Sequence, residues 1–248
     1  MATSSGMELQ SPPIAPPRRI APLWHTIVLI LVLGIFSFLG AKAGHPVARQ
    51  GLVPQYVSMM IVEWLAFGYV VWGIHKGGVL TMRQVIGGRW NKVEDFLLEI
   101  AIAAGFWIVS LIVLAAGAYA LGMAKNANAN FEETKKLLGF LVPQTHLEIA
   151  LWICVALTAG FCEEFIFRGY VQRQFSAISG NVFVGMLVSS IVFGLAHGYE
   201  GSKRMLLIFV YGFLFSSLAE LRKSLRPGMM AHAWHDAFTG LVMRVIFK

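Results

Sequence analysis

Long apolar segments separated by short polar linkers make up most of the chain. The apolar helices that this pattern predicts cover about residues 22–43, 53–74, 96–123, 148–177, 182–199, 204–222 and 227–247. A helix needs about 20 apolar residues to cross a bilayer, and most of these segments reach that length. The largest polar excursion, at 124–147, carries leucines and a phenylalanine at spacings that predict a short interfacial helix. Such a helix would cap or gate whatever lies in the membrane.

The composition fits an integral membrane protein. Hydrophobic residues make up 57% of the chain and charged residues only 13%, whereas soluble domains are about 45–50% apolar. A chain of 248 residues has room for about seven to eight spans and for no large soluble domain. The predicted fold is therefore all-α, a polytopic transmembrane helix bundle of about seven to eight spans.

The charge pattern argues against nucleic acid as a partner. The net charge is +7, but the basic residues are scattered through the loops and form no single stripe. Arg18 and Arg19, with the basic linker after the second span, favour a cytoplasmic amino terminus. The two cysteines, Cys154 and Cys162, lie in one apolar segment and predict neither a disulfide nor a thiolate metal site.

Two adjacent carboxylates and an arginine interrupt the apolar segment at 148–177. A charge at mid-membrane costs about 2.5–3.5 kcal/mol unless it faces the bundle interior or a wet cavity. Glu164 and Arg168 are four residues apart, in the order that favours an intrahelical ion pair. Glu163 lies about 100° around the helix and has no local partner. It is therefore the carboxylate that is free to take a proton or contact a metal.

Histidines follow in two later segments. His197 ends the apolar run 182–199, and His232 and Asp236 share one face of the last predicted helix. If the chain turns as a hairpin near Gly180, Glu163 and His197 lie at the same depth, each about 25 Å from the turn at ~1.5 Å per residue. The same counting places His232 about 10 Å away in depth. We expect helix tilt of about 20° or a bend at Gly201 or Gly228 to close part of that gap.

These residue types suit the activation of water. A glutamate can act as the general base, with histidines that handle protons or bind a metal. A zinc site with an open water position would use His197, His232 and Asp236 as ligands. A metal-free arrangement, in which Glu163 and His197 polarise the water, uses the same side chains, and the residues leave both alternatives open.

Three short motifs occur in order on separate predicted spans: "EEFIFR" as EExxxR, "FGLAH" as FxxxH and "HAWHD" as Hxxx(N/D). Over about residues 148–247 the chain thereby resembles the CPBP family of intramembrane proteases. That family comprises the type II CAAX prenyl endopeptidases and the bacteriocin-processing or bacteriocin-immunity proteins. The resemblance implies a helical bundle with its active site within the membrane, and peptide-bond hydrolysis as the reaction.

The resemblance also implies roles for the motif residues. Glu163 corresponds to the water-activating base and His197 to its partner. His232 and Asp236 correspond to the pair that stabilises the oxyanion or completes a metal site, and Glu164 with Arg168 corresponds to a supporting ion pair. Many members carry Asn where this chain has Asp236. An ionised Asp cannot donate a hydrogen bond to an oxyanion, so the oxyanion role of this position is in question.

The sequence thus predicts three regions: a disordered tail at 1–20, membrane helices with a polar linker at 21–147, and a catalytic membrane module at 148–248. The expected partners are the lipid bilayer and a peptide or lipidated protein substrate. The short chain and compact loops favour a bacterial inner membrane protein. The alternative function is a non-proteolytic immunity or peptide-binding scaffold protein that uses the same cavity. Glu63 lies at mid-span without a visible partner, and both a functional role and a pair with a distant histidine remain open.

Overall fold

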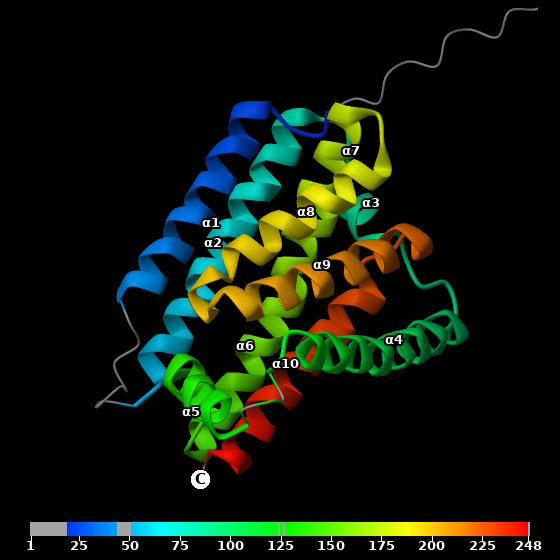
Figure 1. Ribbon diagram of the computed structural model, residues 1–248. Coiled ribbons are helices and arrows are strands. Elements are labelled where there is room, and N and C mark those ends of the chain that lie inside the picture. Colours follow the sequence, from blue (N-terminus) through cyan, green and yellow to red (C-terminus); the bar gives the residue numbers. More distant parts are fainter. Residues whose placement is uncertain (1–18, 44–50, 124, 126, 248) are drawn as a thin grey trace, which may run out of the picture.

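The computed structural model describes residues 19–43, 51–123, 125 and 127–247, and its regular structure within these ranges is entirely helical (Figure 1). The α-helices are α1 (Leu23–Ala43), α2 (Val53–Gly77), α3 (Met82–Ile86), α4 (Val93–Ala120), α5 (Ala127–Leu138), α6 (His146–Glu164), α7 (Arg173–Ser179), α8 (Val182–Ala196), α9 (Ser202–Arg222) and α10 (Arg226–Ile246). A π-helix, η2 (Phe165–Gln172), joins α6 to α7, and the 3₁₀ turns are η1 (Gly139–Leu141) and η3 (Gly198–Glu200). The predicted all-α fold is confirmed. Residues 1–18 of the predicted tail lie outside the described residues.

Every predicted apolar helix corresponds to a helix in the structure. Five helical segments are long and apolar enough to cross a membrane, and they are α1, α2, α4, the continuous stretch His146–Ser179, and α9. Helix α8 is also apolar but has only 15 residues. Helix α10 carries charged and histidine side chains along its length, which lowers its hydropathy. The count of seven to eight spans therefore stays a prediction.

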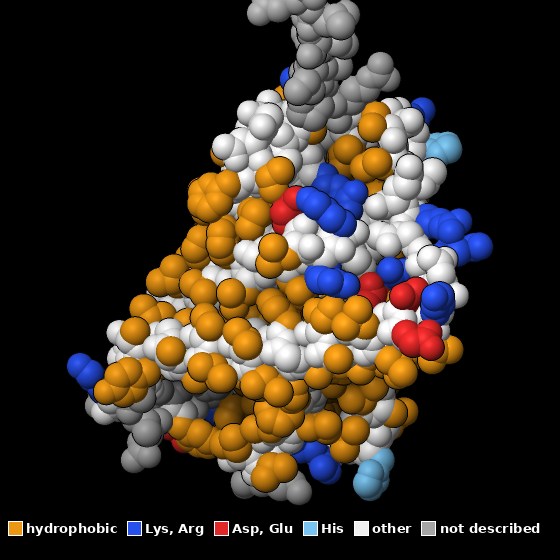
Figure 2. Space-filling model, turned by 90° about the vertical axis from the view of Figure 1, so that its right-hand side faces the viewer, with side chains coloured by type: hydrophobic (Ala, Val, Ile, Leu, Met, Phe, Trp, Pro, Cys, Tyr) orange, Lys and Arg blue, Asp and Glu red, His pale blue; other side chains and the backbone are white. Residues whose placement is uncertain are grey.

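The outer surface of the bundle is strongly apolar. Large hydrophobic side chains stand exposed along α1, α2 and α4, among them Phe36, Leu65 and Ile112, which are 60%, 68% and 63% exposed. In Figure 2, hydrophobic side chains cover most of the left and lower part of the visible face, and charged side chains gather toward its upper and right-hand part. Soluble monomers rarely expose contiguous apolar patches larger than a few hundred Å². The chain is an integral membrane protein.

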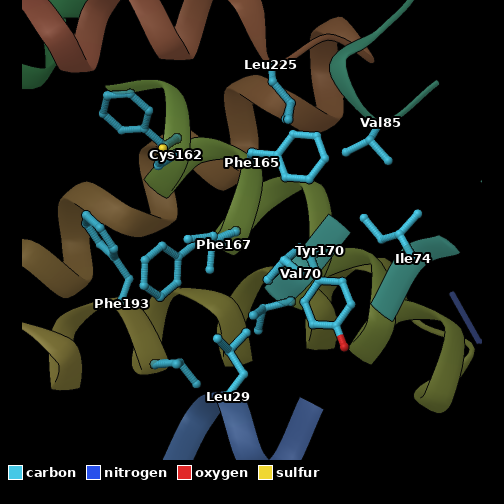
Figure 3. Close-up of a cluster of buried hydrophobic side chains, with 14 of the residues drawn as sticks. Leu29, Val70, Ile74, Val85, Cys162, Phe165, Phe167, Tyr170, Phe193 and Leu225 are labelled. Atoms are coloured by element: carbon cyan, nitrogen blue, oxygen red, sulfur yellow. The ribbon is translucent and has the colours of Figure 1, made fainter. Parts of the chain in front are cut away.

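The π-helix η2 lies at the centre of the core, and all eight of its residues are buried. Figure 3 shows Phe165, Phe167 and Tyr170 among side chains from α1, α2 and α8. The π-helix begins directly after Glu164. The helical periodicity of the sequence did not predict it, and segments of this kind occur frequently at functional sites.

The predicted hairpin between the first two motif segments is confirmed. Gly180 adopts a left-handed conformation (φ 69°) that ends α7, and glycine takes this conformation without a Cβ penalty. The Asn181 side chain then accepts hydrogen bonds from the backbone N–H groups of Phe183 and Val184, at 2.8 and 3.4 Å. This N-cap starts α8 and returns the chain antiparallel to α6 and η2.

Helix α10 packs very closely against α6. A Cβ atom on Gly160 of α6 would lie 2.6 Å from the carbonyl oxygen of Met229 and 2.8 Å from the backbone nitrogen of Ala233. Only glycine fits between the two backbones at this distance. The close approach brings the amino-terminal part of α10 against the end of α6, where Glu163 and Glu164 lie.

A buried hydrogen-bond chain holds the start of α1 to the core. The His25 Nε2 atom lies 2.9 Å from the Tyr69 carbonyl oxygen, so this nitrogen is the donor and Nδ1 is the acceptor. The Tyr170 hydroxyl therefore donates to His25 Nδ1 at 2.7 Å and accepts from the Thr26 hydroxyl at 2.8 Å. Gln174 Nε2 donates to the Thr26 oxygen at 3.2 Å. The hydrogen bonds therefore run in one donor-to-acceptor order, from Gln174 through Thr26, Tyr170 and His25 to the Tyr69 carbonyl oxygen.

Removing the Tyr170 hydroxyl is expected to destabilise the protein by about 1–3 kcal/mol, because His25 Nδ1 loses its donor in a buried position. Thermal unfolding of Tyr170→Phe in detergent micelles measures the effect. Tyr119→Phe is the matched control, since Tyr119 is 73% exposed. Equal thermal unfolding midpoints for Tyr170→Phe and Tyr119→Phe would contradict the stabilising role of this hydrogen-bond chain.

Candidate active site

A cavity of about 200 Å³ lies among α2, α6, α8, α9 and α10. Four predicted site residues line it: Glu163, His197, His232 and Asp236. The structure thus brings together, from three helices, the side chains that the motifs place far apart in the sequence. The other two predicted residues, Glu164 and Arg168, lie directly behind the cavity wall.

Glu163 lies between the two histidines. Its Oε1 atom is 3.9 Å from His197 Nε2, and its Oε2 atom is 3.7 Å from His232 Nε2. The His232 Nε2 atom is also 3.7 Å from Asp236 Oδ2. These separations are longer than direct hydrogen bonds. They are of the size at which a bridging water should be considered.

Glu164 orients His232 from the other side of the ring. Its Oε1 atom lies 3.0 Å from His232 Nδ1, and a carboxylate oxygen can only accept there. Nδ1 therefore carries the proton, and Nε2 is directed toward Glu163 and Asp236. His197 has the same tautomer for a different reason, because its Nδ1 donates to the Phe193 carbonyl oxygen at 2.9 Å. Both imidazoles present Nε2 to Glu163.

The Glu164 and Arg168 ion pair predicted from their spacing is present. Arg168 Nη1 donates to Glu164 Oε1 at 2.9 Å, and both side chains are almost fully buried. Arg168 Nη2 also donates to the Gly212 carbonyl oxygen at 3.0 Å. The guanidinium lies 4.4 Å above the Phe193 ring and 5.2 Å from the Phe215 ring. The pair therefore ties the end of α6 to α9 and holds the carboxylate that orients His232.

His232 is much closer to Glu163 than counting along the spans predicted. The estimate of about 10 Å in depth assumed upright helices, whereas α8 and α9 cross α1 and α2 obliquely in Figure 1. The chain also turns sharply at Gly201 (φ 94°) before α9 begins. Gly228, which we expected as a bend, instead lies in the first turn of α10, where a Cβ atom would be 3.3 Å from the Glu164 carboxylate.

The predicted zinc ligands His197, His232 and Asp236 border one cavity. Among the residues that the structure describes, however, no three His, Cys, Asp or Glu side chains are grouped so that they could hold a metal ion. His232 Nε2 and Asp236 Oδ2 are near each other, and no comparable contact joins His197 to them within the described part of the chain.

Glu63 is the residue whose place the sequence left open. It lines the same cavity from α2, and its buried Oε2 atom has no hydrogen-bond partner. The charges that act on it most strongly are those of Glu163 and Asp236. Its charge at mid-span was the only signal in the sequence, and it did not indicate which helices Glu63 would face.

Further polar side chains line the cavity from η3, α9 and α10, and they are Tyr199, Glu200, Tyr211, His235 and Thr239. Most of them have no distinguishing pattern in the sequence. Glu200 lies outside the spanning helices, and burial raises the pKa of its carboxyl above the ordinary value, while the nearby His197 acts in the opposite direction.

The segment after α5 covers one side of the cavity, as the polar excursion predicted. Leu138, Leu141 and Val142 line the cavity wall. The Tyr56 hydroxyl of α2 donates to the Leu141 carbonyl oxygen at 2.7 Å. At the other end of the segment, a Glu148 carboxylate oxygen on α6 accepts from the Gln144 backbone N–H at 2.9 Å. The cover is therefore held to α2 and α6 through its ends.

Comparison with known proteins gives one family. Residues 145–238 match the model of the type II CAAX prenyl endopeptidase Rce1-like family. No curated protein and no solved structure matches the chain. The matched range contains all three motifs and every predicted site residue. The family is one of peptidases, which implies a hydrolase acting on peptide bonds. Residues 145–238 belong to the CAAX protease, or CPBP, family of intramembrane proteases that the three motifs resemble.

Proposed function

We propose that the protein is an intramembrane endopeptidase that cleaves a peptide bond of a membrane-associated or lipidated peptide or protein. The observation that carries the proposal is the position of the Glu163 carboxylate, which faces His197 Nε2 and His232 Nε2 at 3.9 and 3.7 Å. A water molecule at hydrogen-bond distance from Glu163 and an imidazole would have both a base and an orienting partner.

The hydrolysis proceeds in two steps. Glu163 takes a proton from water as the water oxygen forms a bond to the scissile carbonyl carbon, which leaves a tetrahedral intermediate with a negative oxygen. Glu163 then returns that proton to the amide nitrogen, the carbon–nitrogen bond breaks, and a carboxylic acid and an amine are released. His197 accepts the other hydrogen of the water at Nε2, which orients the water for attack, and His232 Nε2 faces the same carboxylate from the other side.

The surroundings support these roles. Catalytic groups must be held within a fraction of an ångström of their working positions. His232 is held by Glu164, which is held in turn by Arg168, and His197 is held by the Phe193 carbonyl oxygen. Glu163 itself has a buried Oε2 atom without a hydrogen-bond partner in the described part of the chain. No hydrogen bond to this oxygen therefore competes with the proton that Glu163 takes from water.

The experiment compares the amino termini of membrane proteins in cells with the active protein and with Glu163→Ala. We expect new amino termini that appear only with the active protein and that mark the substrate. Equal termini, together with retained biological protection by Glu163→Ala, would contradict hydrolysis and favour an immunity or peptide-binding scaffold protein that uses the same cavity.

The same proposal includes a bacterial inner membrane location, a cytoplasmic amino terminus, and a leader peptide or membrane protein as substrate. Zinc, bound by His197, His232 and Asp236 after rearrangement of these side chains, stays a prediction. Direct metal analysis of purified active protein tests it, and less than one zinc ion per active chain would contradict it.

A further inference from the structure

The Tyr211 hydroxyl is a buried donor without a use in the fold. Tyr211 lies on α9 and is only 5% exposed, and its hydroxyl has no hydrogen-bond partner in the described part of the chain. Leaving a buried hydroxyl unpaired costs about 1–3 kcal/mol. Buried groups of this kind call for an explanation, and one explanation is a catalytic role.

Tyr211 belongs to the cavity that contains the proposed catalytic residues. The charged groups that act on its hydroxyl include Asp236 and Glu163. Its ring packs on Phe215, with centroids 4.5 Å apart, and contacts the His232 ring at 6.0 Å. These ring contacts, to Phe215 on α9 and His232 on α10, hold the phenol in the wall of the cavity.

The proposed reaction needs a donor that the predicted residues do not provide. A tetrahedral intermediate carries a negative oxygen, which active sites stabilise with hydrogen-bond donors. An ionised Asp236 cannot donate. Neutral His197 and His232 carry their protons on Nδ1, where they are already bonded to Phe193 and Glu164. A second proton on His232 Nε2 would face the carboxylates of Glu163 and Asp236.

Few other donors reach the cavity. The Trp152 indole N–H is engaged by the Asp236 carbonyl oxygen at 3.0 Å. His235 also has a buried nitrogen without a partner among the described residues, but the charge that acts on it is that of His232 and not that of a carboxylate of the site. Tyr199 also lines the cavity near Glu163 and Asp236, but its side chain is hydrogen-bonded to Glu200. The Tyr211 phenol lies near the same two carboxylates, and its hydroxyl has no partner in the described part of the chain.

We propose that the Tyr211 hydroxyl donates a hydrogen bond to the negative oxygen of the tetrahedral intermediate, a bond that the Asp236 carboxylate cannot donate. The proposal rests on the proposed peptidase function. It makes Tyr211 a catalytic residue that no motif includes. This hydrogen bond forms only as negative charge develops on the oxygen. It therefore lowers the activation free energy of the reaction and leaves the dissociation constant of the substrate unchanged.

The test measures cleavage of a labelled peptide by purified full-length protein in detergent micelles, with a peptide taken from the substrate that the amino-terminal comparison identifies. In Tyr211→Phe we expect kcat to fall about 10²- to 10³-fold, the usual effect of removing one oxyanion donor, with KM little changed. Tyr119→Phe, which removes an exposed hydroxyl that is not part of the cavity lining, is expected to leave both constants unchanged.

A rescue variant separates catalysis from structure. Adding Asp236→Asn to Tyr211→Phe supplies an amide donor to the same cavity from α10, and we expect kcat to recover at least tenfold. A packing defect at Tyr211 would not be repaired by an amide on α10. Recovery therefore supports donation to the oxyanion.

Three results would overturn the assignment. Glu163-dependent cleavage with an unchanged kcat in Tyr211→Phe would show that another group supplies the donor while the peptidase function stands. A loss in His235→Phe of the size expected for Tyr211→Phe, with Tyr211→Phe unaffected, would assign the donor to His235. Absence of any Glu163-dependent cleavage would overturn the peptidase function and this proposal together.

Discussion

The Glu163→Gln variant is expected to cleave peptide about 10²- to 10⁴-fold more slowly than the wild-type protein, because an amide cannot take a proton from water. Gln has the size of Glu, and the Oε2 atom that becomes an amide group has no hydrogen-bond partner among the described residues. The fold should therefore be unaffected. The measurement is kcat on a labelled membrane peptide, with thermal unfolding of the same samples as the check on folding.

The matched control for this variant is Glu132→Gln, which changes an exposed carboxylate on α5. It is expected to retain wild-type kcat. If Glu163→Gln kept wild-type kcat in a folded protein, water activation by Glu163 would be wrong, and the base would have to be sought among the other carboxylates of the cavity, of which Glu63 is the least engaged.

Arg168→Met is expected to lower the free energy of unfolding by about 3–5 kcal/mol, since it leaves the buried Glu164 carboxylate without its cation. Both side chains are almost fully buried, and their atoms are 2.9 Å apart. The loss of the hydrogen bond to the Gly212 carbonyl oxygen adds to the effect. Thermal and denaturant unfolding in detergent micelles measure the change.

Two further variants show whether the loss of stability in Arg168→Met comes from the uncompensated charge of Glu164. Arg222→Met removes an exposed arginine at the end of α9, and we expect its stability to stay within about 0.5 kcal/mol of the wild type. Combining Arg168→Met with Glu164→Gln removes the uncompensated charge, so the double variant should be more stable than Arg168→Met alone. A double variant that is no more stable would mean that packing, and not charge, dominates at Arg168.

Local features of the chain were predictable because they depend on neighbours in the sequence. Helix positions follow from runs of apolar residues. The contact between Glu164 and Arg168 follows from the four-residue spacing that places them on one helix face. The hairpin at Gly180 follows from a glycine and an asparagine between two apolar runs, and it also places Glu163 near His197. The π-helix η2 has no such signal in the sequence.

The position of the last helix was not predictable in the same way. Counting residues gives depth only for upright spans, and the approach of His232 to Glu163 depends on how obliquely the helices cross. That crossing is decided by side-chain packing between elements distant in sequence, such as the contact of Gly160 with the backbone at Met229 and Ala233. A glycine in an apolar run does not reveal which helix will pack against it.

The sequence by itself determined that this is a helical membrane protein, that Glu164 and Arg168 neutralise each other, and that Glu163 is left free, because hydropathy and helical spacing are properties of short segments. Only the tertiary structure decided that Glu63 and Tyr211 share the cavity of Glu163, and that Glu164 orients His232. Those contacts join four helices, and contacts between helices arise from packing that no local pattern encodes.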